Sequence, residues 1–396
     1  MLWFEQLRMF FEQNGLLAAA AKDQGRPPLR IISFRTAKEY EEYRPRADAD
    51  AAYISDEDGD YIIMASLEPG TFCVAAHEYT HYVLHTNGLK LPPWLNEGLA
   101  EFFSTLKVSG SEYELGGDLP ARRQTLRRTR WLPLTALLEA KDESATVHTR
   151  KADEIFYAES WALVDMLSTS GHYSAGFREL ISEFKAGSNP AEAFRKVYGE
   201  SLDQVAKSLE NWVGQARSTR GILAKPVGSD VVLSRELSVH QANTILAQLS
   251  FVTGHFERAR IQYEELSREE PDNSDLPAAL GRIALRQGNR DEALKQWRRA
   301  LRIGTSNASL CYHFALLSEE AGLDAQVEEA ALERAVALFP RFDEARYKLA
   351  LLQNRAGEYR SAVKQLQSME VPAGARRYGY WVAMTNALTE LDARDE

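Results

Sequence analysis

The stretch HEYTHYVLHTNGLKLPPWLNEGLAEFF, residues 77–103, carries two histidines one helical turn apart, followed by a second apolar segment with two glutamates. On a helix, His77 and His81 project from one face with about 5–6 Å between their Cβ atoms, close enough to share a metal ion. Gly88 suits the end of this helix, and the Pro-Pro pair at 92–93 suits the first turn of the next. The stretch therefore predicts two neighbouring helices joined by a short loop.

A third metal ligand can come from the second helix. Glu97 follows His81 by 16 residues, which leaves room for a loop and a helical turn to bring its carboxylate back to the imidazoles. Glu101, one turn later, can accept a hydrogen bond from a ligating histidine. Glu78 is not a ligand but can take a proton from a metal-activated water. The alternative is a pair of amphipathic helices with exposed polar faces, on which His85 is one more polar residue.

These motifs resemble the gluzincin clan of zinc metallopeptidases, in which HExxH is followed by a helix containing NEG or NEA. The resemblance follows the order of elements over roughly residues 29–216, but its specific motifs occupy only 76–103 and one later segment. It implies one Zn²⁺ per chain. The residues to which it assigns roles are the ligands His77, His81 and Glu97, the general base Glu78, and Glu101 in the outer shell.

The later segment, FYAESWALVDML, is similar to a helix of the aminopeptidase branch whose tyrosine donates its hydroxyl to the developing oxyanion. Tyr157 lies 60 residues after Glu97, a similar separation, although it can equally anchor its helix to the core. The aminopeptidase GxMEN stretch is altered, because Ala65 and Ser66 replace its glutamate and asparagine. In the aminopeptidases, that glutamate holds the free amine of the substrate. We therefore expect an endopeptidase in which an edge strand at 61–65 pairs with an extended substrate.

The rest of the first half predicts a small mixed sheet followed by helices. LRIISF at 29–34 is a short β-rich run, and two further runs at 51–55 and 60–66 flank the turn-forming Asp58 and Gly59, a hairpin pattern. The N-terminal segment predicts a packed helix rather than a signal peptide. Its apolar face consists of Leu2, Phe4, Leu7, Phe10 and Phe11.

The second half repeats itself. Four glycines fall at intervals of 34, 34 and 35 residues between helix-length amphipathic segments, a pattern that resembles the tetratricopeptide repeat. These glycines are Gly254, Gly288, Gly322 and Gly357. Small residues at matching positions let paired helices cross closely, while each glycine supplies a left-handed turn. The small residues are Ala247, Gly281, Ala315, Ala350, Ala259, Ala293, Ala362, Ala300 and Ala335.

The predicted fold class is α+β, with a small mixed sheet and a helical zincin core, followed by an all-α tetratricopeptide-repeat solenoid. The metallopeptidase-like domain spans 1–217, and a linker at 218–237 contains Gly221, Pro226 and Gly228. The repeat domain spans 238–396, with about four repeats and a terminal helix.

Composition limits the partners. The net charge of −10 gives no general attraction to nucleic acid, and no apolar window is long enough to span a membrane. The only two cysteines, Cys73 and Cys311, lie in different predicted domains, which excludes a disulfide framework, and Cys73 is expected to be a small buried residue. The compartment stays open: cytoplasmic by default, or exported if a signal lies upstream.

Three functions remain open. The first is a zinc metallopeptidase that cleaves a peptide or protein substrate, with a repeat domain that recruits this substrate or a protein partner. The second is a tetratricopeptide scaffold whose metal domain is non-catalytic or gated by a partner. The third is a metal hydrolase that acts on a non-peptide bond. Structural zinc usually has four protein ligands, and no fourth is evident in the sequence, which favours the first.

Overall fold

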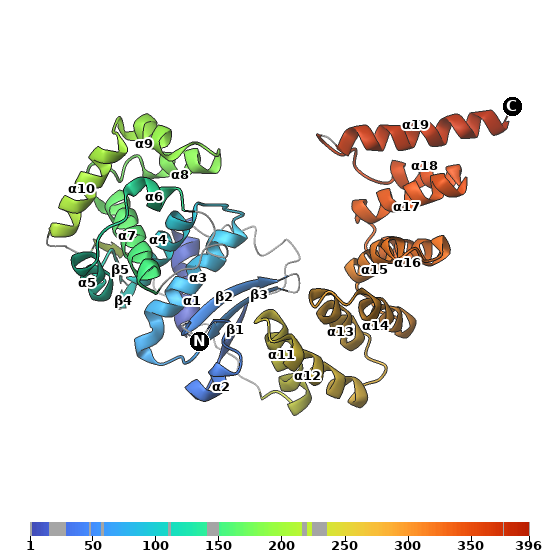
Figure 1. Cartoon of the computed structure of the whole chain (residues 1–396), viewed down its shortest axis with the longest axis horizontal. Coiled ribbons are helices and arrows are strands. Elements are labelled where there is room, and N and C mark those ends of the chain that lie inside the picture. The colour runs from blue at the N-terminus through green and yellow to red at the C-terminus, as the bar shows by residue number, and fades with distance from the viewer. Residues whose placement is uncertain are drawn as a thin grey trace. The chain divides into compact units, whose positions relative to one another are not determined.

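The computed structural model describes residues 2–15, 29–46, 49–56, 59–109, 112–140, 150–215, 220–223, 236–374 and 376–395. The chain divides into two compact units, Met1–Arg235 and Glu236–Glu396 (Figure 1). The division lies inside the stretch that the sequence analysis assigns to a linker. Each unit contains hydrophobic clusters of its own.

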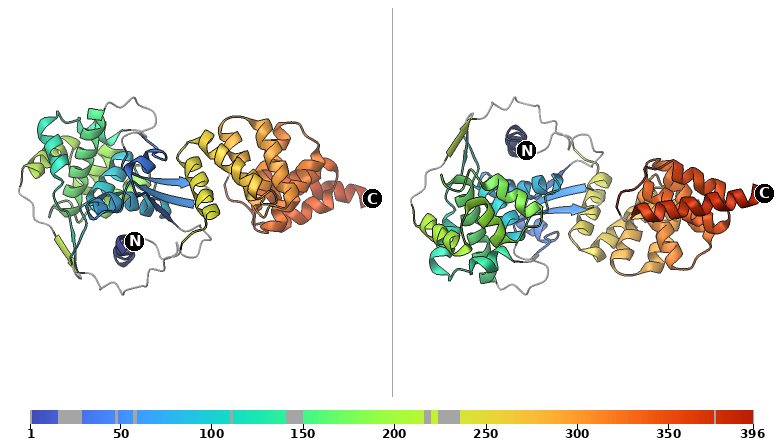
Figure 2. Two further views of the ribbon diagram at one scale, coloured as in Figure 1. Left: turned by 90° about the horizontal axis from the view of Figure 1, so that it is seen from below. Right: turned by 90° about the horizontal axis from the view of Figure 1, so that it is seen from above.

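Unit 1 begins with an apolar helix and a three-stranded mixed sheet of order β1-β3-β2. Figure 2 shows this helix and the strands in blue. The elements are α1 (Leu2–Gln13), β1 (Arg30–Ser33), α2 (Ala37–Glu41), β2 (Ala51–Asp56) and β3 (Gly59–Met64). Strand β1 is parallel to β3, and β2 is antiparallel to it. The predicted hairpin is confirmed, because Asp56 pairs with Gly59. The predicted face of α1 is confirmed for the buried Phe4, Leu7, Phe10 and Phe11.

The expectation that residues 61–65 form an edge strand is wrong. Tyr61 on β3 pairs with Arg30 of β1 on one side and with Ile54 of β2 on the other. All six residues of β3 are buried, as is typical of an interior strand with a continuous apolar run. The edge strand that contacts the histidine helix is β2.

The two helices predicted from residues 77–103 are α3 (Phe72–Thr86) and α4 (Pro93–Ser104), with a short 3-10 turn, η2 (Pro69–Thr71), before them. Gly88 follows the end of α3 and has a φ of 65°, the left-handed conformation that glycine adopts without strain. Pro93 is the first residue of α4. The apolar face of α4 is buried, with Trp94, Leu95, Leu99, Phe102 and Phe103 in the core.

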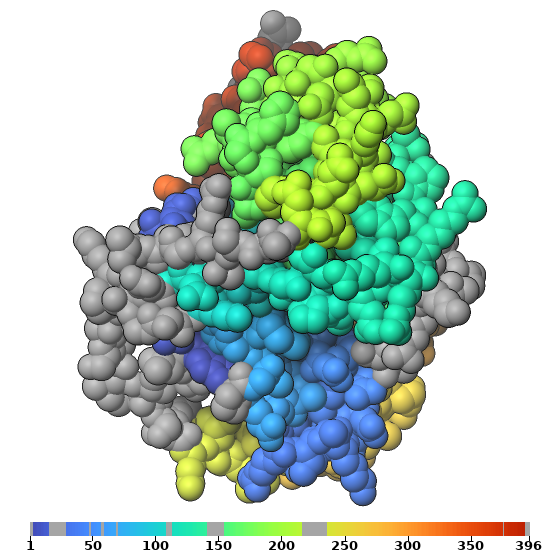
Figure 3. Space-filling model, turned by 90° about the vertical axis from the view of Figure 1, so that its left-hand side faces the viewer, coloured from blue at the N-terminus to red at the C-terminus, as the bar shows by residue number. Residues whose placement is uncertain are grey.

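A second sheet and a layer of helices complete unit 1. The elements are β4 (Lys107–Ser109), β5 (Glu112–Leu115), α5 (Pro120–Arg128), α6 (Leu134–Leu138), α7 (Arg150–Thr169), α8 (Phe177–Lys185), α9 (Pro190–Tyr198), α10 (Leu202–Gly214) and β6 (Arg220–Leu223). Figure 3 shows the face of this unit on which the later helices, in green and yellow-green, lie beside the teal segment that includes α5. Strand β6 corrects the predicted linker, because residues 220–223 pair with β5 of unit 1.

Helix α7 lies at the centre of these helices and is buried on every side over residues 158–167. It crosses α4 at Gly98, where an added Cβ would lie 2.5 Å from both the Ser160 carbonyl oxygen and Val164 Cγ2. The glycine of the NEG triplet is therefore required for the close approach of the two helices. This crossing fixes the position of Glu97, the neighbouring residue.

One buried carboxyl of α7 makes the stability of unit 1 depend on pH. The side chain of Glu159 is 2% exposed and accepts the Leu132 N–H at 2.7 Å. Burial raises the pKa of Glu159 to about 7, against a smaller lowering by this hydrogen bond. Because the folded pKa lies above the unfolded one, its neutral form stabilises the fold fully at low pH. This stabilisation is lost as pH rises towards 7.

We therefore expect Glu159→Gln to raise the free energy of unfolding by about 2–3 kcal/mol at pH 8 and to change it little near pH 4.5. Glutamine keeps an acceptor for the Leu132 N–H and carries no charge. Urea unfolding of variant and wild type at both pH values measures the difference. Glu139→Gln, at an exposed position, is the control and should show no difference at either pH. Equal midpoints for Glu159→Gln and wild type at pH 8 would contradict the prediction.

Unit 2 consists of four helical hairpins and a final helix. The hairpins are α11 (Val239–Val252) with α12 (Phe256–Glu269), α13 (Asp275–Arg286) with α14 (Arg290–Ile303), α15 (Ala308–Glu320) with α16 (Ala325–Leu338), and α17 (Asp343–Ala356) with α18 (Tyr359–Gln367), followed by α19 (Arg376–Asp395). The four predicted turn glycines all have positive φ, between 66° and 81°. Helices pack mainly on their neighbours in sequence. At Gly281, a Cβ would lie 2.2 Å from Trp297, so the predicted need for a small residue is confirmed there.

Two further expectations concern the cysteines and a membrane span. Cys311 is buried, but Cys73 is exposed in the first turn of α3, so the prediction of a buried Cys73 is wrong. Across the described ranges, every helix is too short or too polar to cross a bilayer.

Candidate metal centre

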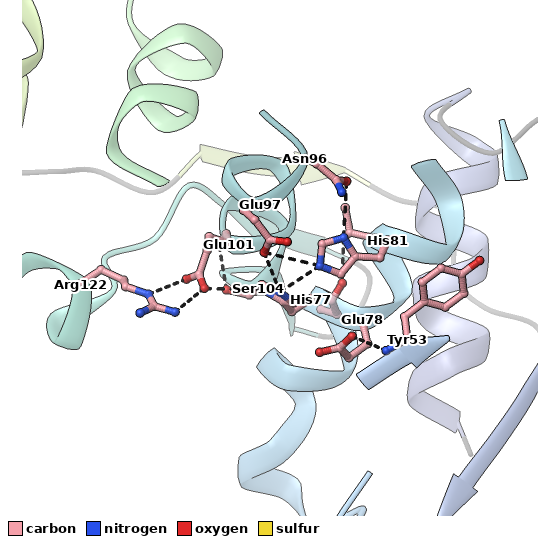
Figure 4. Close-up of polar contacts among 11 residues, drawn as sticks. Tyr53, His77, Glu78, His81, Asn96, Glu97, Glu101, Ser104 and Arg122 are labelled. Atoms are coloured by element: carbon pink, nitrogen blue, oxygen red, sulfur yellow. Dashed lines mark hydrogen bonds and ion pairs between the residues drawn. The ribbon is translucent and has the colours of Figure 1, made fainter. Parts of the chain in front are cut away.

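Helices α3 and α4 bring the three predicted ligands together (Figure 4). His77 Nε2 lies 3.1 Å from His81 Nε2, and Glu97 Oε2 lies 3.5 Å from the first and 3.6 Å from the second. Ligand atoms of a tetrahedral zinc ion, about 2.0–2.1 Å from the metal, are about 3.3–3.4 Å apart. The three distances therefore fit one zinc ion. In the part of the chain that the structure describes, no other group of three His, Cys, Asp or Glu side chains has such spacing.

The charges of the three side chains are coupled. Burial lowers the pKa of His77, but the contact with Glu97 and the negative charges of Glu78 and Glu101 outweigh it and raise that pKa to about 9. Burial raises the pKa of Glu97, whereas His81 and His77 lower it, and the net shift is downward. A metal that binds here near neutral pH would therefore displace a proton from His77, so acid opposes binding.

A polar side chain from α4 lies near the outer ring nitrogen of each histidine. His81 Nδ1 lies 3.4 Å from Asn96 Oδ1, a contact that the sequence analysis missed although Asn96 begins the NEG triplet. His77 Nδ1 lies 3.7 Å from Glu101 Oε1, too long for a hydrogen bond. Instead, Glu101 accepts hydrogen bonds from Arg122 Nε at 3.0 Å and Nη2 at 2.5 Å. The structure thus places Glu101 beside His77, as expected, but gives it a hydrogen-bonding partner that the sequence did not indicate.

The carboxylate of Glu78 stands next to the ligand group without belonging to it. Its Oε2 accepts the backbone N–H of Tyr53, on the edge strand β2, at 2.6 Å. Because successive residues of a strand direct their backbone groups to opposite sides, those of 51, 53 and 55 face away from β3. The edge strand therefore anchors the predicted general base.

The three predicted ligands and Glu78 line one cleft of about 510 Å³. Tyr157 also lines it, and its ring centre lies 5.1 Å from Arg122 Cζ. His85 lines it as well, and its Nδ1 lies 2.7 Å from the Tyr53 hydroxyl, which also donates to Asp60. The structure thus brings every sequence-predicted site residue to the cleft or, for Glu101, directly behind it.

Comparisons with known proteins concern the repeats. No protein-family model matches the chain, and no curated protein matches it. A structure titled as MamA protein is 19% identical over 39% of this chain and 84% of its own, with a TM-score of 0.31. YrrB, described as a TPR protein with an unusual peptide-binding site, is 20% identical over 38% of this chain and 81% of its own, with a TM-score of 0.30.

A tetratricopeptide repeat protein from Parabacteroides merdae is 23% identical over 39% of this chain and 61% of its own, with a TM-score of 0.32. These likenesses are too partial to support an argument and give no evidence on the metal centre. The helical hairpins, with a glycine turn every 34 or 35 residues, make unit 2 an all-helical repeat array whose period is similar to that of the tetratricopeptide repeat.

Proposed function

We propose that unit 1 is a zinc-dependent peptidase and that the repeat unit recruits its protein substrate or a protein partner. The observation that supports this proposal is the spacing of 3.1–3.6 Å among the donor atoms of His77, His81 and Glu97. Structural zinc usually has four protein ligands, whereas catalytic zinc has three. Within the described residues the group has three members, so the catalytic class fits better.

The surrounding residues suit peptide hydrolysis. A bound zinc ion would polarise the scissile carbonyl and lower the pKa of a coordinated water. Glu78, held by the Tyr53 N–H, is the residue to accept the proton of the attacking water. Tyr157 lines the same cleft and is proposed to donate its hydroxyl to the developing oxyanion.

The edge of β2 suits an extended substrate. Residues 51–54 line the cleft, and alternate backbone groups of this strand face away from β3. A peptide can therefore pair with the outward backbone groups of β2 other than the Tyr53 N–H, which Glu78 accepts, in the way that the sequence analysis expected for residues 61–65. Such pairing holds a peptide by its main chain rather than by a terminus, which supports an endopeptidase.

A second candidate is a repeat scaffold in which the metal unit is silent. It is favoured by the helical repeat array of unit 2, with its glycine turn every 34 or 35 residues. Arrays of this kind present extended surfaces to protein partners. On this alternative the protein would bind its partner equally well with and without metal and would cleave nothing.

Metal removal tests the proposed function. The purified chain should contain about one zinc per chain and cleave a quenched peptide mixture. Dialysis against a chelator should abolish the cleavage, and added Zn²⁺ should restore it. Full zinc occupancy without cleavage of any peptide or denatured protein would favour the scaffold or a non-peptide substrate. A chain that binds no zinc would exclude the peptidase.

A further inference from the structure

Arg122 lies near the metal centre, and no sequence motif points to it. It extends from α5 and forms a two-point ion pair with Glu101 on α4, through Nε at 3.0 Å and Nη2 at 2.5 Å. The Glu101 side chain is 7% exposed and that of Arg122 is 27% exposed. A bidentate arginine–carboxylate pair away from water is strong and fixes the orientation of both groups.

The same guanidinium lies against Tyr157. The distance of 5.1 Å from Cζ to the ring centre is within the range of a cation–π interaction. Arg122 therefore connects α4, which carries the ligand Glu97, with α7, which carries the proposed oxyanion donor. Figure 4 shows Glu101 between Arg122 and His77, which is one of the three predicted ligands.

We infer that Arg122 is a positioning residue of the metal centre, which acts on His77 through Glu101 and on Tyr157 through its ring. A carboxylate can accept about four hydrogen bonds, so Glu101 can serve Arg122 and His77 together. Its Oε1 lies 3.7 Å from His77 Nδ1, and a shift of about 0.8 Å would bring the pair to hydrogen-bond distance. Without the guanidinium, this buried carboxylate would lose the contacts that hold it at that place.

The link to His77 concerns metal binding alone, whereas the link to Tyr157 rests on the proposed function. Zinc affinity tests the first link directly. We expect Arg122→Gln to weaken Zn²⁺ binding by about 10- to 100-fold, as is usual when an outer-shell partner is lost. Arg122→Lys keeps the charge without the two-point geometry and should fall between Arg122→Gln and wild type. Competition with a chromophoric chelator measures the dissociation constant.

Arg123 offers a matched control on the same helix. It forms an ion pair with Asp118 at 2.8 Å and donates to the Val213 carbonyl at 2.9 Å, and it contacts no residue of the metal centre. Arg123→Gln therefore loses comparable contacts and should leave the zinc dissociation constant within about twofold of wild type. Circular dichroism confirms that each variant is folded. An unchanged dissociation constant in folded Arg122→Gln would overturn the inference.

Peptide cleavage tests the second link. In Arg122→Gln saturated with zinc, kcat should fall while KM changes little, because the substrate contacts on β2 are intact. The same substitution should cost less in a Tyr157→Phe background, since the two residues then act as one unit. Fully additive effects would overturn the link to Tyr157. If wild type cleaves no peptide, the proposed function and the link to Tyr157 both fail, and zinc affinity still decides the link to His77.

Discussion

Replacing Glu78 with glutamine is expected to lower kcat/KM for peptide cleavage by about 10³-fold, within the range that a general base contributes, while zinc stays at about one ion per chain. Glutamine has nearly the same shape, and its amide oxygen can still accept the Tyr53 N–H that holds Glu78 at 2.6 Å. The change therefore removes the proton acceptor and keeps the geometry. Steady-state cleavage of a quenched peptide, with metal analysis of the same preparation, measures both quantities.

The matched control for this variant is Glu68→Gln. The Glu68 carboxylate is exposed and lies just before the turn that leads into α3, outside the cleft. It should cleave at the wild-type rate. Turnover by Glu78→Gln equal to that of wild type would exclude Glu78 as the base. The inactive variant also serves as a trap, because a protein that binds to it without being cut identifies the substrate.

Loss of a ligand should have the largest effect on zinc affinity. We expect His81→Ala and Glu97→Gln each to weaken Zn²⁺ binding by more than about 100-fold, because each removes one of three donors, a greater loss than that of an outer-shell partner. Within the described residues the ligand group consists of these two and His77, so neither has a substitute at the same place. Chelator competition and metal analysis measure the loss.

His85→Ala is the control within the same helix. His85 follows His81 by one turn and lines the same cleft, but it lies outside the ligand group. Its side chain is 49% exposed, so its loss should cost little stability, and the variant should keep its zinc. If His81→Ala bound zinc as tightly as His85→Ala does, the interpretation of α3 and α4 as exposed amphipathic helices would replace the metal centre.

Local patterns of the sequence predicted the elements that depend on neighbours in the chain. The spacing of His77 and His81 and the Pro-Pro pair at 92–93 placed α3 and α4, and Asp58 with Gly59 placed the β2–β3 hairpin. The periodic glycines of unit 2 have the positive φ that the helical hairpins require. In each case the pattern lies along the chain itself, in neighbouring or regularly repeated residues. A single sequence is therefore enough to predict these elements.

Features that depend on distant residues were missed. Nothing in residues 61–65 indicates that β1 pairs with β3 from the other side, and nothing in residues 220–223 indicates a partner in β5. Arg122 lies 21 residues after Glu101, with no periodic pattern to connect them. Gly98 matched a motif, but the reason for it, the backbone of α7, lies more than 60 positions further along the chain. Such pairings follow from tertiary packing and are visible only in three dimensions.

The neighbour-to-neighbour packing of the helices in unit 2 has a consequence for how this chain can diverge. Because a hairpin meets mainly the hairpins before and after it, one whole hairpin can be gained or lost and leave the rest of the series intact. The length of the surface proposed to recruit a protein can therefore change in whole modules during evolution, while the candidate metal centre of the other unit is inherited unaltered.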